Sequence, residues 1–144
     1  RLRTGGRGHR RLLVQQFDQY QPFPDQPAVR VNGELTLPEN VADLGGLNAA
    51  YDALQRTLAG NPFLARANID GYSQDQRFFM GWARNWRVNY RPQQLRVLLE
   101  SDPHAPGAFR AIGTPSNMPA FADAFACQAG DPMVRPPEQQ ITIW

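Results

Sequence analysis

The sequence predicts one mainly α-helical domain, or part of a larger one. Three segments, at about residues 37–59, 73–88 and 93–100, carry apolar side chains at the three- and four-residue steps of a helix. A length of 144 residues is enough for a hydrophobic core of ordinary size. The hydrophobic fraction of 42% argues against a wholly disordered chain, and no apolar run approaches the roughly 20 residues that span a bilayer.

The positive charge of the chain is concentrated at its N-terminal end. Residues 1–11, RLRTGGRGHRR, hold five arginines, and without them the chain would be acidic. One hypothesis is a nucleic-acid-binding domain that uses these residues together with the basic face at Arg77, Arg84 and Arg91. That face is better interpreted as the solvated side of an amphipathic helix, so we expect no nucleic-acid partner. Residues 1–11 are expected to be a disordered leader, and residues 12–144 the folded part.

The first half of the folded part contains a short helix and a long one. The short helix is predicted at residues 12–20 and is followed by a proline-rich extended connection at 21–31. The long helix is predicted at residues 37–59, with Thr36 as its N-cap and Pro38 in its first turn. A Gly-Asn-Pro sequence ends it.

Two further helices are predicted in the middle of the chain. One begins at Ser73, where Gln76 is placed to complete a capping box, and reaches about Val88. Its apolar stripe is aromatic and is expected to face the core. The other occupies residues 93–100, directly after Pro92.

The C-terminal third is expected to be poor in regular structure. Residues 101–119 hold so many prolines and glycines that we predict a long loop. A short helix at 119–125 precedes an extended tail from 130 to 144. Because a long loop in so small a domain is usually functional or packed on something else, the chain is expected to be a piece of a larger fold.

Two acidic residues, Glu39 and Asp43, stand one turn apart on the long helix and therefore point the same way. They border the leucine stripe, on a flank of small residues that lets a neighbouring element approach closely. Carboxylates beside a core require a metal, a histidine or an arginine, because burying unpaired charge costs several kcal/mol. The alternative is that both are exposed acids near the helix N-terminus, where the helix dipole favours them.

Two basic residues lie on the predicted long loop. His104 stands between prolines in DPHAP, and Arg110 follows six residues later. A histidine and an arginine together can stabilise a developing oxyanion and hold a substrate carbonyl or carboxylate. The alternative is an ordinary loop histidine.

Seven motifs, taken together, resemble one known family. The longest is VNGELTLPENVADLGGL at residues 31–47. The others are QDQRFF at 74–79, DPHAPG at 102–107, FR at 109–110, NMPAF at 117–121, GDPM at 130–133 and the terminal Trp144. They resemble, in the same order, the C-terminal part of the catalytic domain in the neprilysin and endothelin-converting-enzyme family of zinc metallopeptidases, which are gluzincins. The resemblance runs from about residue 12 to residue 144.

This resemblance implies a fold and a set of roles. The fold would be the C-terminal helical portion of a thermolysin-like zinc metallopeptidase catalytic domain, with a long loop and an extended tail. Glu39 would be the third zinc ligand, and Asp43 would orient a zinc-binding histidine. His104 would stabilise the tetrahedral intermediate formed when zinc-activated water attacks a peptide bond, and Arg110 would hold the substrate backbone. The implied activity is endopeptidase hydrolysis of oligopeptides.

The chain departs from the family at one essential motif. The His-Glu-x-x-His sequence that supplies the other two zinc ligands and the general base is absent, and residues 9–13 read HRRLL. Since a catalytic zinc site needs three protein ligands and a water, the chain alone is expected to bind zinc weakly or not at all and to be inactive. It would be either a truncated piece of a peptidase, whose partner is the remainder of that chain, or a remnant that binds a peptide or partner without cleaving it. The parent is expected to be periplasmic, secreted or membrane-tethered.

Overall fold

The computed structural model describes residues 5–143, and its regular elements are helices, with no strand in that range. This confirms the mainly α-helical fold class. None of the described helices is long and apolar enough to cross a membrane. The elements in chain order are α1 Gly5–Phe17, α2 Gly33–Ala59, α3 Pro62–Arg66, α4 Gln74–Asn85, α5 Pro92–Ser101, α6 Gly107–Gly113, η1 Pro115–Asn117, α7 Pro119–Phe125 and η2 Pro137–Gln139.

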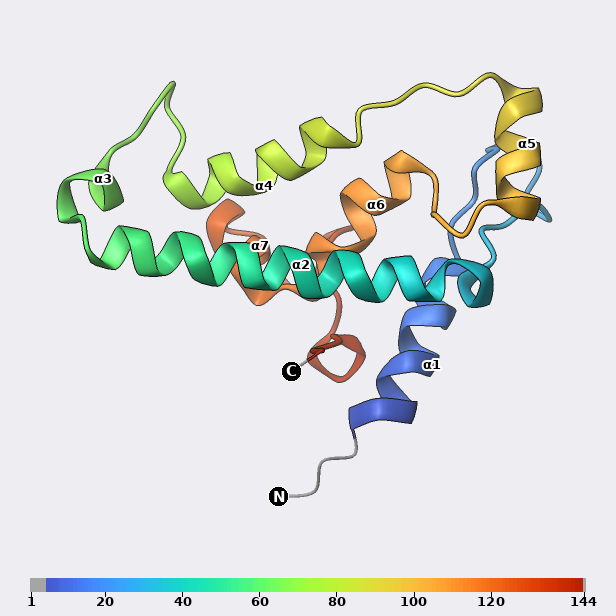
Figure 1. Ribbon diagram of the computed structural model, residues 1–144, viewed down its shortest axis with the longest axis horizontal. Coiled ribbons are helices and arrows are strands. Elements are labelled where there is room, and N and C mark those ends of the chain that lie inside the picture. The colour runs from blue at the N-terminus through green and yellow to red at the C-terminus, as the bar shows by residue number, and fades with distance from the viewer. Residues whose placement is uncertain (1–4, 144) are drawn as a thin grey trace.

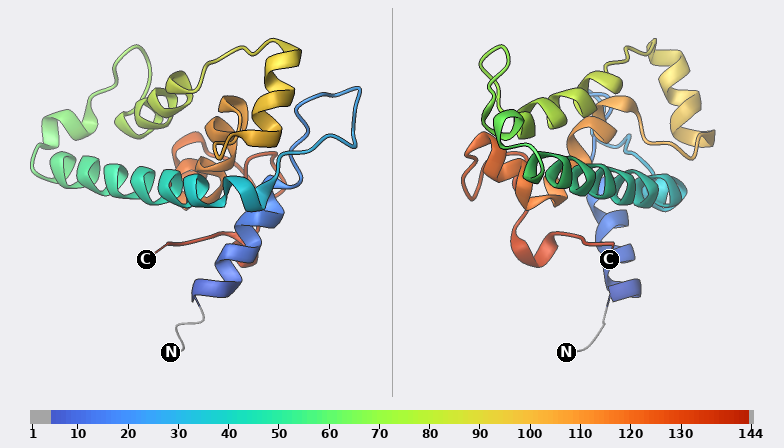
Figure 2. Two further views of the ribbon diagram at one scale, coloured as in Figure 1. Left: turned by 45° about the vertical axis from the view of Figure 1, so that its right-hand side comes forward. Right: turned by 60° about the vertical axis from the view of Figure 1, so that its left-hand side comes forward.

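The long helix α2 is the element on which the others are arranged. It runs the length of the molecule, with α1 crossing one of its ends and α4, α6 and α7 lying along it (Figures 1 and 2). The core forms where α1 meets α2, and includes the buried residues Leu13, Phe17, Leu44 and Leu47. The C-terminal tail returns to this core and buries Ile141.

Helix α2 begins earlier than its sequence predicted. Asn32, and not Thr36, is the N-cap, because its side-chain oxygen accepts from the Leu35 backbone nitrogen at 3.0 Å. Thr36 lies in the first turn, where its hydroxyl donates to the Asn32 carbonyl oxygen. Pro38 therefore lies inside the helix, which the fixed φ of proline permits at the loss of one backbone hydrogen bond. The predicted end is confirmed, with Gly60 as C-cap.

Helix α1 also begins earlier than expected and extends into the predicted leader. Residues 5–11 are helical, whereas residues 1–4 lie outside the described part of the chain. Leu13, Val14 and Phe17 anchor the helix on α2, and extension of an existing helix needs no second nucleation. Within the extension, Arg10 pairs with Glu34 of α2 at 3.2 Å.

The two middle helices follow the sequence closely. The capping box at the start of α4 is formed by Ser73 and Gln76 as predicted, although the helix ends at Asn85 and not at Val88. Helix α5 begins at Pro92. The short helix α3 was not predicted. It begins directly after the end of α2, where the Asn61 side chain caps it.

The predicted long loop at residues 101–119 is the main correction to the fold. It contains α6 and the single turn η1. Its prolines mark boundaries and do not interrupt the helices, since Pro106 is the N-cap of α6 and Pro115 opens η1. A Cβ on Gly113, the last residue of α6, would lie only 3.0 Å from the Phe17 ring and the Tyr20 hydroxyl, so this glycine allows close packing on α1.

A buried polar cluster fixes the end of α6 to α1. The Gln16 side-chain nitrogen donates to the Gly113 carbonyl at 2.8 Å and to the Ser116 hydroxyl at 3.2 Å. The Asn117 side-chain nitrogen donates to the Gln16 side-chain oxygen at 2.9 Å and to the Gly113 carbonyl at 3.0 Å. Segments about 100 residues apart in the sequence are thereby joined.

Replacing Gln16 by Met should destabilise the fold while keeping the volume of the side chain. The substitution deletes the hydrogen bonds of the buried amide, and we expect a loss of about 2 kcal/mol in the free energy of unfolding, measured by urea denaturation. Gln15→Met is the matched control, because Gln15 is the adjacent residue and is exposed. Equal stability of the two variants would contradict a structural role for the cluster.

The Tyr51 phenol of α2 should titrate late. Burial and the neighbouring Asp75 carboxylate, which accepts from the Tyr51 hydroxyl at 3.1 Å, raise the pKa of Tyr51 to about 12. Stability that depends on the protonated phenol is complete below the unfolded pKa of about 10 and is lost as pH rises toward 12. Tyr51→Phe should remove ultraviolet tyrosinate absorbance that forms near pH 12. A variant that instead loses absorbance forming near the ordinary tyrosine pKa of about 10 would disprove the assignment.

Candidate functional site

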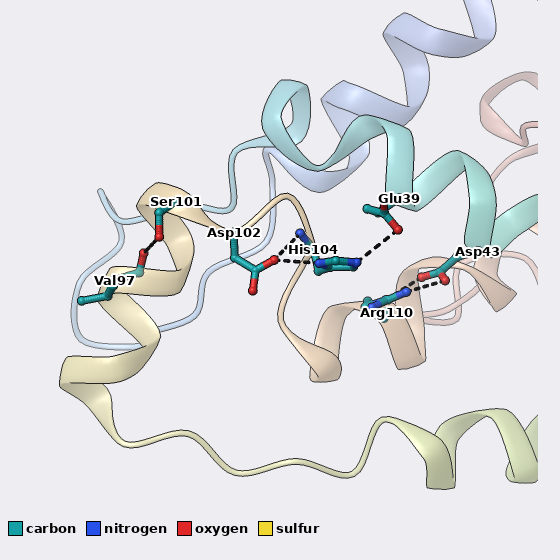
Figure 3. Close-up of polar contacts among 7 residues, drawn as sticks. All are labelled: Glu39, Asp43, Val97, Ser101, Asp102, His104 and Arg110. Carbon is teal, nitrogen blue, oxygen red and sulfur yellow. Dashed lines mark hydrogen bonds and ion pairs between the residues drawn. The ribbon is translucent and has the colours of Figure 1, made fainter.

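The four residues singled out in the sequence come together where α2 faces α6 and the turn before it (Figure 3). Helix α2 presents Glu39 and Asp43, one turn apart. The opposite side presents His104 from the turn after α5 and Arg110 from α6. Each acid contacts one of the two bases, which gives an exposed outer pair and a buried inner pair.

The inner pair joins Asp43 to Arg110 through two parallel hydrogen bonds. Arg110 Nε donates to Asp43 Oδ2 at 2.7 Å, and Arg110 Nη2 donates to Asp43 Oδ1 at 2.6 Å. The Asp43 side chain is only 10% exposed, and the Arg110 side chain is 12% exposed. A bidentate pair of this kind fixes both side chains in one orientation. Arg110 has five N–H donors and Asp43 can accept further hydrogen bonds, so neither is saturated by the pair.

The outer pair places His104 between two carboxylates. Its Nε2 lies 3.2 Å from Glu39 Oε2, and its Nδ1 lies 2.7 Å from Asp102 Oδ1. Because a carboxylate only accepts, both contacts are hydrogen bonds only when both ring nitrogens carry a proton. The His104 side chain is 46% exposed and that of Glu39 is 36% exposed, so this pair is open to solvent or to another part of a larger protein.

Asp102 orients the histidine from two directions. Its Oδ1 accepts from the His104 backbone nitrogen at 2.8 Å as well as contacting the ring. The hydrogen bond from the His104 backbone, together with that from the ring, lowers the pKa of the Asp102 carboxyl below its ordinary value. Asp102 therefore stays a carboxylate that can hold the Nδ1–H.

Two tryptophans contact Arg110: Trp82 of α4 and Trp86, the C-cap residue of that helix. The guanidinium carbon lies 3.7 Å from the centre of the Trp86 ring, over its face, and the Trp82 indole nitrogen donates to the Arg110 carbonyl at 3.1 Å. A cation over an indole face is stabilised by the negative charge density of the ring. Close packing here also needs Gly107, because a Cβ at this position would lie 2.7 Å from the Trp86 carbonyl oxygen.

The described residues do not make a complete zinc site. In residues 5–143, no group of three or more His, Cys, Asp or Glu side chains is arranged to hold a metal ion. A catalytic zinc needs three protein ligands. Glu39 offers one carboxylate, and its contact with His104 occupies one of its oxygens.

The sequence singled out the four central residues but not the residues that support them. Asp102 belongs to the quoted DPHAPG motif, and its spacing of two residues before His104 was the available signal. Trp82 and Trp86 were assigned to the core stripe of their helix, and both are only partly buried. Their contact with Arg110 depends on the placement of α6, a helix the sequence did not predict.

Replacing Asp43 by Asn should be strongly destabilising. The variant leaves the buried Arg110 guanidinium without its charged partner, and we expect a loss of about 3 kcal/mol in the free energy of unfolding, measured by urea denaturation. Asp52→Asn, on the exposed side of the same helix, is the control and should change stability by less than about 0.5 kcal/mol. A small effect at Asp43 would show that the inner pair is not an important contact between α2 and α6.

Sequence comparison matches residues 6–141 of this chain to Peptidase family M13. Endothelin-converting enzyme 1 of Mus musculus is 38% identical over 132 residues, which are 92% of this chain and 16% of the relative. Neprilysin-21 of Caenorhabditis elegans is 31% identical over 137 residues, or 93% of this chain and 17% of that protein. The chain thus spans about one sixth of the length of the relatives it matches.

The fold agrees with that of solved metallopeptidases. The zinc metalloprotease ZMP1 of Mycobacterium tuberculosis in its open state superposes with a TM-score of 0.88 and 36% identity, covering 95% of this chain and 21% of ZMP1. PepO from Lactobacillus rhamnosis gives a TM-score of 0.76 and 31% identity, over 96% of this chain and 19% of PepO. The sequence match over residues 6–141 and these structural matches together establish that the chain belongs to Peptidase family M13, the metallopeptidase family of neprilysin and endothelin-converting enzyme.

Proposed function

We propose that this chain supplies the C-terminal half of the active site of a zinc metalloendopeptidase that hydrolyses oligopeptides. Glu39 is the zinc ligand of this half-site, and Asp43 orients a zinc-binding histidine from elsewhere in the complete enzyme. His104 stabilises the charge that develops on the peptide carbonyl oxygen, and Arg110 holds the substrate backbone.

One observation carries this proposal: two carboxylates one turn apart on α2 each face a base from the turn and helix on the opposite side. The outer Glu39–His104 pair is partly exposed, and groups that meet a metal and a substrate must be accessible. The inner Asp43–Arg110 pair is largely buried, which suits a carboxylate that orients another group and an arginine held in one position for a substrate.

The chemistry of the bases suits the roles proposed for them. When both ring nitrogens of His104 are protonated, Nε2 can donate to an oxygen that gains negative charge, while Asp102 keeps the ring in place. Arg110 uses two N–H groups on Asp43 and retains others for a peptide carbonyl. These two donors act on the substrate, whereas the acids act on the metal and its ligands.

The other half of the site must come from outside this chain. Glu39 is a single ligand, so we expect the chain alone to bind zinc weakly and to cleave no peptide. Its partners are a peptide substrate and the remainder of a peptidase chain. A periplasmic, secreted or membrane-tethered location of the parent is part of the same proposal.

A chimaera with an intact relative tests the half-site directly. The segment of Mycobacterium tuberculosis ZMP1 that matches this chain is replaced by the chain, which is 36% identical to it. We expect the chimaera to hydrolyse a fluorogenic oligopeptide and to lose activity with a zinc chelator. Glu39→Gln should reduce kcat/KM at least about 100-fold. Loss of a residue that only supports a zinc ligand can already cost that much, and Glu39 is proposed to be a ligand itself.

Glu34→Gln is the control for this substitution. Glu34 lies on the first turn of α2, and its side chain is 65% exposed, so the variant should keep the activity of the chimaera. Equal losses from the two substitutions would contradict the ligand role of Glu39. A chimaera that binds peptide without hydrolysing it, while the ZMP1 parent is active, would favour a non-catalytic peptide-binding remnant.

A further inference from the structure

We propose that Trp82 is a positioning residue for Arg110, acting on both its main chain and its side chain. Arg110 contributes to the inner pair, but α6 has only seven residues, too few for a stable helix by itself. Its orientation must therefore come from neighbouring elements. The functional meaning of this inference rests on the proposed role of Arg110 in holding the substrate backbone.

The first contact acts on the main chain. The Trp82 indole nitrogen donates to the Arg110 carbonyl at 3.1 Å, across 28 residues of sequence. This carbonyl belongs to the last turn of α6, where a helix runs out of backbone donors for its carbonyl groups. The bond therefore ties the turn that carries Arg110 to the rigid helix α4.

The second contact acts on the side chain through Trp86. The rings of Trp82 and Trp86 meet edge to face, with centroids 5.3 Å apart and planes at 69°. The Arg110 guanidinium lies over the face of the same Trp86 ring. The Trp86 indole nitrogen is buried and meets no acceptor in the described part of the chain, so packing against Trp82 and Arg110 sets the angle of this ring.

The two contacts converge on one geometry. The main-chain bond sets where the Arg110 side chain starts, and the Trp82–Trp86 pair sets the plane on which its guanidinium lies. Asp43 then meets a guanidinium already aligned for two parallel hydrogen bonds. Loss of Trp82 should therefore loosen Arg110 more than it loosens the fold.

Nuclear magnetic resonance of the 144-residue chain tests this inference without reference to catalysis. The Arg110 Nε–H signal reports the Asp43 hydrogen bond directly, through its exchange with water. Trp82→Phe keeps an aromatic ring and deletes the indole donor, and we expect a roughly 3- to 10-fold faster exchange of the Arg110 Nε–H. An unchanged exchange rate would overturn the inference.

Phe78→Leu is the matched control. Phe78 lies one turn earlier on α4 and packs on Tyr51 and Phe79, so its replacement loosens the same helix without removing a contact to Arg110. Arg110 exchange that rises equally in both variants would show a merely structural role for Trp82. Should Trp82→Phe fail to fold, the wild-type chain still tests the main-chain contact, because a Trp82 indole N–H that exchanges as fast as a free indole would overturn the inference.

This readout separates the inference from the proposed function. An inactive chimaera with a normal, protected Arg110 signal would overturn the peptidase role and leave the positioning by Trp82 intact. An active chimaera whose kcat/KM is unaffected by Trp82→Phe, together with unchanged exchange in the chain, would overturn only the inference.

Discussion

The buried ion pair between Asp43 and Arg110 is the interaction on which the candidate site depends. It is the point where α2 is joined to α6 through two charged hydrogen bonds, both 2.7 Å or shorter. Removing one partner would leave a largely buried charge unpaired, so the pair holds the two helices in one relative position. Glu39 lies on the same helix as Asp43, and His104 lies six residues before Arg110. The relative position of α2 and α6 therefore also sets where Glu39 and His104 meet.

Support for the inner pair is distributed around α6. Its N-terminal end packs against the backbone of Trp86, where Gly107 leaves room. Its C-terminal end is bonded to α1 through Gln16. A seven-residue helix is thus held by α1, α2 and α4 together, which is a way of giving precise geometry to a segment with little stability of its own.

The contrast between the two pairs matches the roles proposed for them. Asp43, proposed to orient another group, is largely buried, whereas Glu39 and His104, proposed to meet a metal and a substrate, remain partly exposed. Arg110 is largely buried but keeps N–H groups that Asp43 does not use. Glu39 contacts one ring nitrogen of His104 at 3.2 Å, while Asp102 holds the other ring nitrogen at 2.7 Å.

The sequence by itself determined the helical class, the capping box of α4, the paired acids on α2 and the family, because these depend on local spacing and on motifs. The helical nature of residues 5–11 and of α6 was decided by the tertiary structure, whereas α2 starts at a local cap, Asn32, that the sequence prediction passed over in favour of Thr36. Prolines and glycines predict a loop when only local propensity is considered, but close packing at Gly107 and Gly113 stabilises α6 as a helix. The partnership of Asp43 with Arg110 spans 67 residues, and no local rule could choose between these and other charges.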